Sequence, residues 1–182
     1  SDVLEWYRVK KAPIVLGHEI AGTVEETGPG VDRWKRGDRV FVSHHVPCNT
    51  CPACLGGHHT ACPTLHGTNF DPGGFAEYVA VPAANAHPVH RALSDVEWAS
   101  FPCSYSTAEH LLARSGVGSG DEVLVTGASG GVGSAAVQLA KARGAAVTAV
   151  CGAAKTAAVA ALGADRTLDR DEPVGEQAFD VV

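Results

Sequence analysis

The chain has 182 residues, 45% of them apolar and 19% charged, so the sequence predicts a folded globular protein rather than a disordered one. Its formal net charge of −6 disfavours a nucleic-acid surface, and no apolar run approaches the roughly 20 residues that span a bilayer. We therefore expect a cytoplasmic protein whose partners include neither nucleic acid nor a membrane.

The first part of the chain has the pattern of a small β-rich domain. Four short apolar runs are bounded by Gly and Pro turns, as the strands of a barrel or sandwich are: residues 14–16, 20–24, 39–42 and 73–82. Farther along the pattern changes. Ser94 and Glu97 have the spacing of a capping box, which predicts that a helix begins there, and Ser106 and Glu109 repeat that spacing. We place a domain boundary after residue 97.

Four of the six cysteines gather in one loop of this β-rich part: Cys48, Cys51, Cys54 and Cys62. Four thiolates at these intervals can surround one tetrahedral zinc ion, and a closed Cys₄ set leaves no open coordination position. Such a zinc holds a lobe together and performs no chemistry. The alternatives are two disulfides, which are rare in a reducing compartment, or four unrelated buried thiols.

The last part of the chain has the pattern of a parallel sheet with crossover helices. Strand-like runs at 122–126 and 146–151 enclose a glycine-rich turn and a helical stretch at 134–143, and a second helical stretch follows at 153–162. Strand, glycine turn, helix and strand make a βαβ unit, which implies an α/β fold with right-handed crossovers.

The glycine-rich turn follows the first of these strands directly, where a dinucleotide-binding loop would lie. Glycines let a pyrophosphate approach the backbone, and the helix behind them supplies free N–H groups. We expect five residues to bind the nucleotide: Gly127, Gly130, Gly131, Val132 and Gly133. Their spacing is Gly-x-x-Gly-x-x-Gly, and the alternative is a glycine-rich turn of some other doubly wound protein.

The end of the second strand informs the choice between NAD and NADP. NAD sites usually carry an acidic residue there, which bonds the ribose hydroxyls, whereas residues 150–155 contain none. A carboxylate would repel a 2′-phosphate, so its absence, with Lys155 nearby, favours NADP over NAD. The alternative is that Lys155 is a solvated residue at the start of a helix.

His18, Glu19 and Cys103 are candidate ligands of a second metal. Neutral imidazole binds zinc well, and an adjacent carboxylate can ligate or orient. Each residue alone has an ordinary explanation, as a structural histidine, a surface acid or a small buried thiol. They matter together because a catalytic zinc needs about three protein ligands and an open position, which the four-cysteine lobe does not provide.

These motifs occur in one order along the chain: Gly17-His18-Glu19-x-x-Gly22, the four-cysteine lobe, Cys103 four residues before Thr107, and Gly130-Gly131-Val132-Gly133. In this combination the chain resembles the zinc-containing medium-chain alcohol or polyol dehydrogenases. The resemblance implies a GroES-like catalytic domain over residues 1–97, with the zinc lobe at 48–62, and a partial Rossmann domain over residues 98–182.

The resemblance also implies roles for single residues. His18 and Cys103 would hold a catalytic zinc together with a cysteine about two residues before Ser1, and Glu19 would be a conditional ligand or an orienting group. This implied cysteine precedes the visible start of the chain. The chain has no initial Met, and Phe179–Val182 reads as the opening of a buried strand. We therefore treat the chain as a fragment of a longer protein.

Three further roles follow from the same resemblance. Ser1 would pass on the proton of the alcohol, Asp2 would lie near the zinc, and Thr107 would flank the nicotinamide. Leu4 occupies the place where many relatives have a histidine, so a proton relay through that place needs another route. The segment 126–133 resembles the zinc-free quinone reductase branch more than the zinc-containing branch, which again favours NADP.

The function that these features support is hydride transfer between NAD(P) and an alcohol, polyol, aldehyde or ketone, with structural and catalytic zinc. We expect a small-molecule substrate and a homo-oligomer, a dimer or tetramer, for the full-length protein. One alternative is an NADPH-dependent enoyl or quinone reductase with the structural zinc alone. Another is a zinc-stabilised binding module, and we expect the fragment by itself to be inactive.

Overall fold

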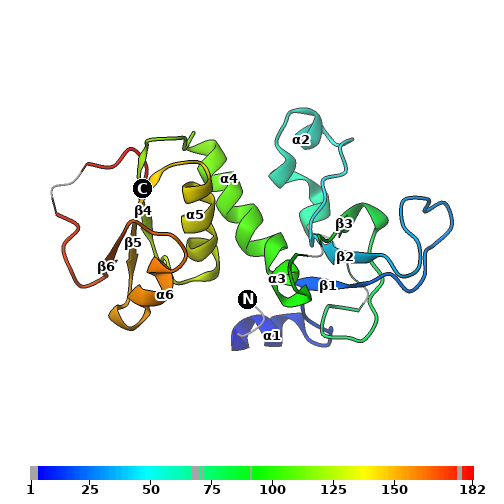
Figure 1. Ribbon diagram of the computed structural model, residues 1–182. Coiled ribbons are helices and arrows are strands. Elements are labelled where there is room, and N and C mark those ends of the chain that lie inside the picture. Colours follow the sequence, from blue (N-terminus) through cyan, green and yellow to red (C-terminus); the bar gives the residue numbers. More distant parts are fainter. Residues whose placement is uncertain (1–3, 67–69, 71, 91, 176–177) are drawn as a thin grey trace. The chain divides into compact units, whose positions relative to one another are not determined.

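The computed structural model describes residues 4–66, 70, 72–90, 92–175 and 178–182. The chain divides into two compact units, Ser1–Pro102 and Cys103–Val182. The domain boundary expected after residue 97 falls within a helix, α3 (Asp95–Ser100). In Figure 1 the first unit contains the antiparallel strands β1 to β3, and the second contains the parallel strands β4 to β6.

The first unit is built on a three-stranded antiparallel sheet in the order β1-β2-β3, formed by Ile20–Thr23, Arg39–Val42 and Ala86–Pro88. Its register pairs Ile20 with Val42 and Val40 with Pro88. Short helical segments complete the unit: α1 (Glu5–Lys11), α2 (Pro52–Leu55), α3, and 3-10 turns at His59–Ala61, Pro63–His66 and Ala83–Asn85.

The strands predicted at 20–24 and 39–42 are confirmed, whereas those predicted at 14–16 and 73–82 are wrong. The two latter segments approach each other only briefly. Gly74 donates its N–H to Gly17 O and Phe75 donates its N–H to Leu16 O, both at 2.9 Å, but neither segment is a strand.

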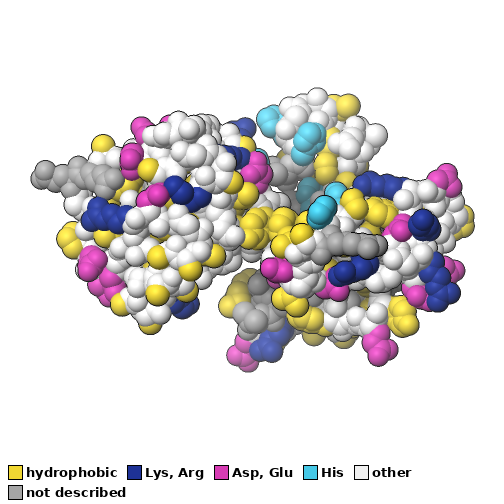
Figure 2. Space-filling view, in the orientation of Figure 1, with side chains coloured by type: hydrophobic (Ala, Val, Ile, Leu, Met, Phe, Trp, Pro, Cys, Tyr) yellow, Lys and Arg dark blue, Asp and Glu magenta, His cyan; other side chains and the backbone are white. Residues whose placement is uncertain are grey.

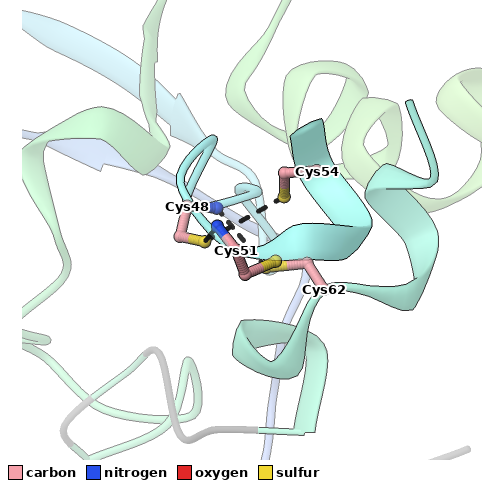
Figure 3. Close-up of side chains that lie close together, drawn as sticks. All are labelled: Cys48, Cys51, Cys54 and Cys62. Atoms are coloured by element: carbon pink, nitrogen blue, oxygen red, sulfur yellow. Dashed lines mark hydrogen bonds between the residues drawn. The ribbon is translucent and has the colours of Figure 1, made fainter. Parts of the chain in front are cut away.

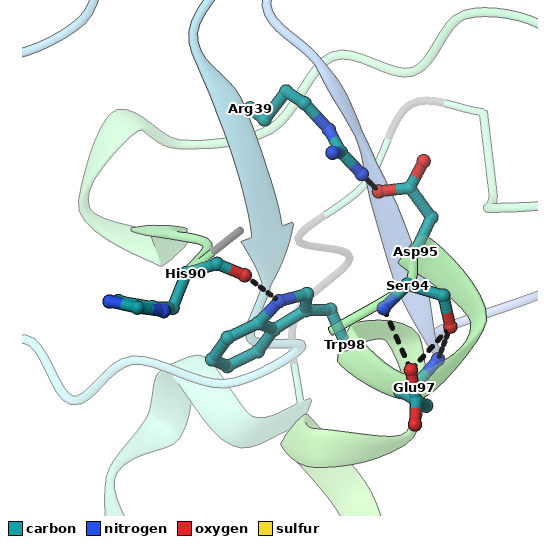
Figure 4. Close-up of polar contacts among 6 residues, drawn as sticks. All are labelled: Arg39, His90, Ser94, Asp95, Glu97 and Trp98. Carbon is teal, nitrogen blue, oxygen red and sulfur yellow. Dashed lines mark hydrogen bonds and ion pairs between the residues drawn. The ribbon is translucent and has the colours of Figure 1, made fainter. Parts of the chain in front are cut away.

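The capping box predicted at the start of α3 is present (Figure 4). Ser94 Oγ accepts a hydrogen bond from the Glu97 N–H at 3.3 Å, and the Glu97 carboxylate accepts one from the Ser94 N–H at 2.7 Å. The hydrogen bonds from Ser94 lower the pKa of Glu97. Two backbone N–H groups at the helix start are therefore satisfied by side chains.

Aromatic stacking attaches α3 to the sheet. The Trp98 ring stacks on Phe41 of β2, with centroids 5.2 Å apart and planes 10° from parallel. Trp98 Nε1 also donates to His90 O at 2.9 Å, and Arg39 of β2 pairs with Asp95 (Figure 4). The helix is therefore held to β2 at both of its ends.

The second unit is a parallel sheet in the order β4-β5-β6, formed by Glu122–Thr126, Ala146–Cys151 and Arg166–Asp169. Val181 bridges to Val123 on the other side of β4, also in parallel. The chain order therefore reverses at β4, as it does in Rossmann sheets. The helices are α4 (Ser106–Arg114), α5 (Gly131–Ala142) and α6 (Thr156–Ala160), and no helix of the described residues is long and apolar enough to cross a membrane.

The strands predicted at 122–126 and 146–151 are confirmed. The segment Phe179–Val182, predicted to open a buried strand, forms only an isolated bridge from Val181 to Val123, and Val182 is 82% exposed. The helix predicted at 134–143 begins earlier, at Gly131, because the glycine turn supplies its first residues. The second capping box, at Ser106 and Glu109, is wrong. The preceding residues already form a π-helical turn that runs into α4, so the helix has no free start at Ser106 for a hydroxyl to cap.

Small side chains allow α5 to pack closely on the sheet. Ala135, Val137 and Ala140 of α5 are fully buried, as are Val147 and Ala149 of β5. An ion pair supports the same region, because Lys141 Nζ donates to the Asp165 carboxylate at 2.8 Å.

Asp165 should make stability depend on pH. The hydrogen bonds from Lys141 and from the Val147 N–H lower the pKa of Asp165 below its ordinary value of 3.8. The ionised Asp165 therefore stabilises the fold fully above pH 3.8, and this stabilisation is lost as the pH falls through the pKa of the folded state. Asp165→Asn should lower the free energy of unfolding by about 1 kcal/mol at pH 7, a figure limited by the half-exposed position.

Urea unfolding at pH 7 and pH 3 measures this effect, with Asp171→Asn as the exposed control. The difference between Asp165→Asn and the parent should shrink at pH 3, whereas the control should track the parent at both. An equal difference at the two pH values would contradict the assignment to the ion pair.

Candidate metal centre and dinucleotide site

The four cysteines of the loop between β2 and β3 converge on one point (Figure 3). Their sulfur atoms lie within 4.8 Å of one another, and Cys48 Sγ and Cys54 Sγ are 4.0 Å apart. Zinc–sulfur bonds of about 2.3 Å in a tetrahedron give sulfur separations of about 3.8 Å, so the cluster has the dimensions of a Cys₄ zinc site. All six cysteines are free thiols, so the disulfide alternative is wrong.

Local backbone geometry builds this cluster. Asn49 has a left-handed φ of 58°, which Asn tolerates better than most residues, and it turns the chain between Cys48 and Cys51. The Cys51 N–H donates to Cys48 Sγ at 3.3 Å, and the Cys48 N–H donates to Cys62 Sγ at 3.4 Å. Pro52 then opens α2, where the missing N–H of proline costs no helical hydrogen bond.

Hydrogen bonds prepare two of these thiols to act as thiolates. Those made with Thr50 lower the pKa of Cys48 to about 5, and the N–H of Cys48 lowers the pKa of Cys62. Burial raises the pKa of Cys54 to about 12, so this thiol gives up its proton only to a cation that replaces it. Four converging sulfurs, of which those of Cys48 and Cys62 accept backbone N–H hydrogen bonds, fit zinc and leave no position for a substrate.

A close backbone contact sets the position of His18. The preceding Gly17 has a left-handed φ of 101°, and a Cβ atom there would lie 2.7 Å from Phe75 N. Phe75 in turn donates its N–H to Leu16 O at 2.9 Å. Because only glycine fits this approach, the backbone on the N-terminal side of His18 is fixed.

A second imidazole, that of His44, lies beside His18. The two ring centroids are 5.7 Å apart and the ring planes are 71° from parallel. Burial, followed by the charges of His18 and His45, lowers the pKa of His44, which keeps its ring neutral at pH 7. In Figure 2 histidine side chains gather over the α2 lobe and the surface next to it. Sequence reasoning missed His44 and His45, although two adjacent histidines before a metal-type cysteine were a visible signal.

Cys103 lies in a π-helical turn, Phe101–Tyr105, that continues directly into α4. Single π-helical turns are frequent at functional sites. The next residue packs against the glycine-rich loop, because a Cβ atom at Gly131 would lie 2.7 Å from Ser104 Oγ. Cys103 is therefore one residue away from a direct contact with the predicted nucleotide loop.

The loop between β4 and α5 has the geometry of a phosphate-binding turn. Gly127 has a left-handed φ of 62°, and a Cβ atom at Gly133 would lie 2.3 Å from Gly127 O, so the start of α5 and the loop after β4 meet backbone to backbone. No side chain caps the helix at Gly130. The first N–H groups of α5 are thus available to an anion such as a pyrophosphate, and the residues fit a dinucleotide.

Three other predicted residues have exposed side chains: Glu19, Thr107 and Lys155. Ser1 and Asp2 lie outside the described residues. His18 and Glu19 belong to the first unit and Cys103 to the second. A joint metal site of these three residues therefore stays a prediction.

Residues 1–91 match the family described as the alcohol dehydrogenase GroES-like domain. An acryloyl-coenzyme A reductase from Metallosphaera sedula is 37% identical over 164 residues, which cover 90% of this chain and 49% of that protein. An NAD-dependent alcohol dehydrogenase from Saccharolobus solfataricus is 40% identical over 134 residues, which cover 72% of this chain and 38% of that protein.

A solved structure of a cobalt- and zinc-bound thermostable alcohol dehydrogenase from Pyrobaculum aerophilum aligns with a TM-score of 0.82 and 38% identity. The alignment covers 93% of this chain and 53% of that one, so the chain spans about half the length of such relatives. The predicted fold class is confirmed: a GroES-like β-rich part precedes a partial Rossmann fold.

Removal of one cluster thiol should cost the chain its structural metal. We expect Cys62→Ala to lower the zinc content by about one ion per chain and to expose the lobe to proteases, because the remaining three sulfurs leave the tetrahedral site open. Cys151→Ala removes an equally buried thiol outside the cluster and should retain the zinc. Metal analysis by mass spectrometry distinguishes these outcomes, and equal zinc in both variants would contradict the site.

Close packing should make glycine necessary at position 133, near the start of α5. Gly133→Ala should lower the free energy of unfolding by about 1–3 kcal/mol, since the added methyl group meets the Gly127 carbonyl and the contact has no flexible side chain to yield. Gly118→Ala is the control, because a Cβ there would meet no atom closer than 3.9 Å. Urea unfolding measures both, and unchanged stability of Gly133→Ala would refute the close contact.

Proposed function

The chain belongs to the zinc-containing medium-chain alcohol dehydrogenase family, and on that premise we propose that the full-length protein transfers hydride between NAD(P) and a small alcohol or carbonyl compound. The observation that carries the proposal is the packing of Ser104 on Gly131. It ties the turn that bears Cys103, a proposed metal ligand, to the loop proposed to bind the nucleotide.

We assign the holding of a second zinc to His18 and Cys103, with Glu19 as an orienting or conditional ligand. When bound, the zinc polarises the substrate oxygen and the nicotinamide accepts or donates the hydride. We propose for Ser1 and Asp2, which lie outside the described residues, the roles that the family resemblance implies: Ser1 takes the proton of the alcohol, and Asp2 supports the metal ligands.

The nucleotide is held by backbone in this proposal. The pyrophosphate binds at the N–H groups that open α5, from Gly131 to Gly133, and the dipole of the 12-residue helix favours its charge. Thr107, one turn after Cys103 in the helix, flanks the nicotinamide.

We propose NADP rather than NAD as the preferred cofactor. The segment that follows β5 runs from Gly152 to the exposed Lys155 without an acidic residue, so nothing there repels a 2′-phosphate. The relative from Saccharolobus solfataricus is named NAD-dependent, so turnover with both cofactors is the direct measurement.

A second candidate function is that of an NADPH-dependent enoyl or quinone reductase with the structural zinc alone. The similarity to an acryloyl-coenzyme A reductase over 90% of this chain favours it. The number of zinc ions per full-length chain separates the two candidates, since the first requires two and the second one. In either case we expect a homo-oligomer, a dimer or tetramer, located in the cytoplasm, where the thiols of the cluster stay reduced.

The deciding experiment uses the full-length protein and the variant His18→Ala. We expect the parent to hold about two zinc ions per chain and the variant about one, with turnover of alcohol reduced by at least about a thousandfold, because three-ligand zinc sites depend on each ligand. The control is His59→Ala, which changes an exposed histidine of the zinc lobe.

Turnover and metal content of the control should equal those of the parent. Full activity of His18→Ala with zinc only in the cysteine cluster would refute the dehydrogenase proposal. One zinc per chain in the parent, with NADPH-dependent reduction of an enoyl or quinone compound, would establish the second candidate instead.

A further inference from the structure

A single threonine connects the cysteine cluster to the segment that carries His44. The Thr64 hydroxyl lies 3.0 Å from Cys62 Sγ, donates to Val46 O at 3.0 Å and lies 3.4 Å from His45 Nε2. A thiolate and a carbonyl oxygen both accept hydrogen bonds, so the one hydroxyl proton is shared between them, while the hydroxyl lone pairs can accept from the His45 ring. Thr64 thus contacts both the four-cysteine cluster and the segment 43–46.

The other end of that segment is fixed to the sheet. Ser43 donates its N–H to Asn85 O at 2.8 Å, and Asn85 Nδ2 donates to Ser43 O at 2.7 Å. The Asn85 side chain belongs to a residue only 3% exposed, and Ser43 Oγ also donates to His45 O at 2.8 Å. A buried residue that is hydrogen-bonded through both its side-chain amide and its backbone carbonyl is expensive to move. The segment therefore has one rigid anchor at Asn85 and a second anchor at Thr64.

His44 lies between these two anchors, and its ring lies edge-on to that of His18. A continuous series of contacts within the first unit thus runs from Cys62 through Thr64 and the segment 43–46 to His44 and His18. The series ends on the residue to which the proposed function assigns the second metal.

We propose that Thr64 is a positioning residue, through which the closed cysteine cluster sets the place of His44 and thereby of the His18 ring. The proposal rests on the proposed function, because it gives the chemically silent zinc lobe an effect on the His18 site. Groups that orient a metal-ligating histidine from outside typically change metal affinity or activity by 10–100-fold when they are removed. Thr64 acts through two further residues, so the lower end of that range, about tenfold, is expected.

The experiment compares Thr64→Val, Thr64→Ser and Thr60→Val in the full-length protein. Valine keeps the shape of threonine and removes the hydroxyl, serine restores the hydroxyl, and Thr60 is an exposed threonine of the same lobe. Three readouts are used: zinc content, the rate at which each zinc is released to a chelator, and the NMR signals of ¹³C-labelled histidine. The His18 signal is the one that disappears in His18→Ala.

We expect Thr64→Val to keep the zinc of the cysteine cluster, to release the second zinc about tenfold faster and to shift the His18 and His44 signals. kcat should fall about tenfold with little change in KM, because the hydroxyl contacts no substrate. Thr64→Ser should recover most of these properties, and Thr60→Val should match the parent.

The histidine signals separate failure of this inference from failure of the proposed function. Unchanged His18 and His44 signals in Thr64→Val, with only the cysteine zinc made more labile, would show that Thr64 serves the lobe alone and would overturn the inference. If the parent holds no second zinc, the proposed function fails, yet the same signals still decide whether Thr64 positions His18.

Discussion

The convergence of four sulfur atoms is the constraint on which the first unit depends. The segment 48–62 that contains them has almost no apolar core, since within it only Cys54 and Cys62 are buried and Leu55 of α2 is 76% exposed. A four-residue helix and two 3-10 turns are not stable by themselves in water. A metal held by the four thiolates would supply the free energy that orders this segment. Because Thr64 joins the cluster to Val46, that order extends to the segment beside the sheet.

Both units use glycine to build their sites from backbone contacts. In the first unit the backbone at Gly17 touches that of Phe75, and in the second Gly133 touches Gly127 O. A methyl group at Gly17 or Gly133 would push the two contacting backbones apart, so only glycine allows this approach. These contacts fix the positions of two candidate sites. His18 directly follows the contact at Gly17, and the N-terminus of α5 lies at the contact of Gly133. The chemistry proposed for these places therefore depends on residues that have no side chain.

The secondary structure of the second unit could be predicted from local sequence patterns. The first unit was harder to predict, because contacts between residues distant in the sequence shape it. The runs at 122–126 and 146–151 are buried on both faces, so their composition alone marks them as parallel strands. Capping-box spacing was right at Ser94, where the chain enters the helix in an extended conformation, and wrong at Ser106, where a π-helical turn already precedes it. The contacts of Thr64 were not predictable, because they join residues up to 19 positions apart in the sequence. The convergence of the four cysteines brings these residues together.

The order of the strands explains why the glycine loop is the place for a ligand. Val181 pairs with one side of β4 and β5 pairs with the other, so successive connections leave β4 in opposite directions. In open parallel sheets such a reversal leaves a crevice at the carboxyl end of the strand, because no helix covers both neighbours there. The residues after β4 are Gly127 to Gly133, four of them glycines, and the uncapped N-terminus of α5 lies among them. Ser104 packs on the same loop, so the residue after Cys103 contacts the candidate nucleotide loop within the second unit.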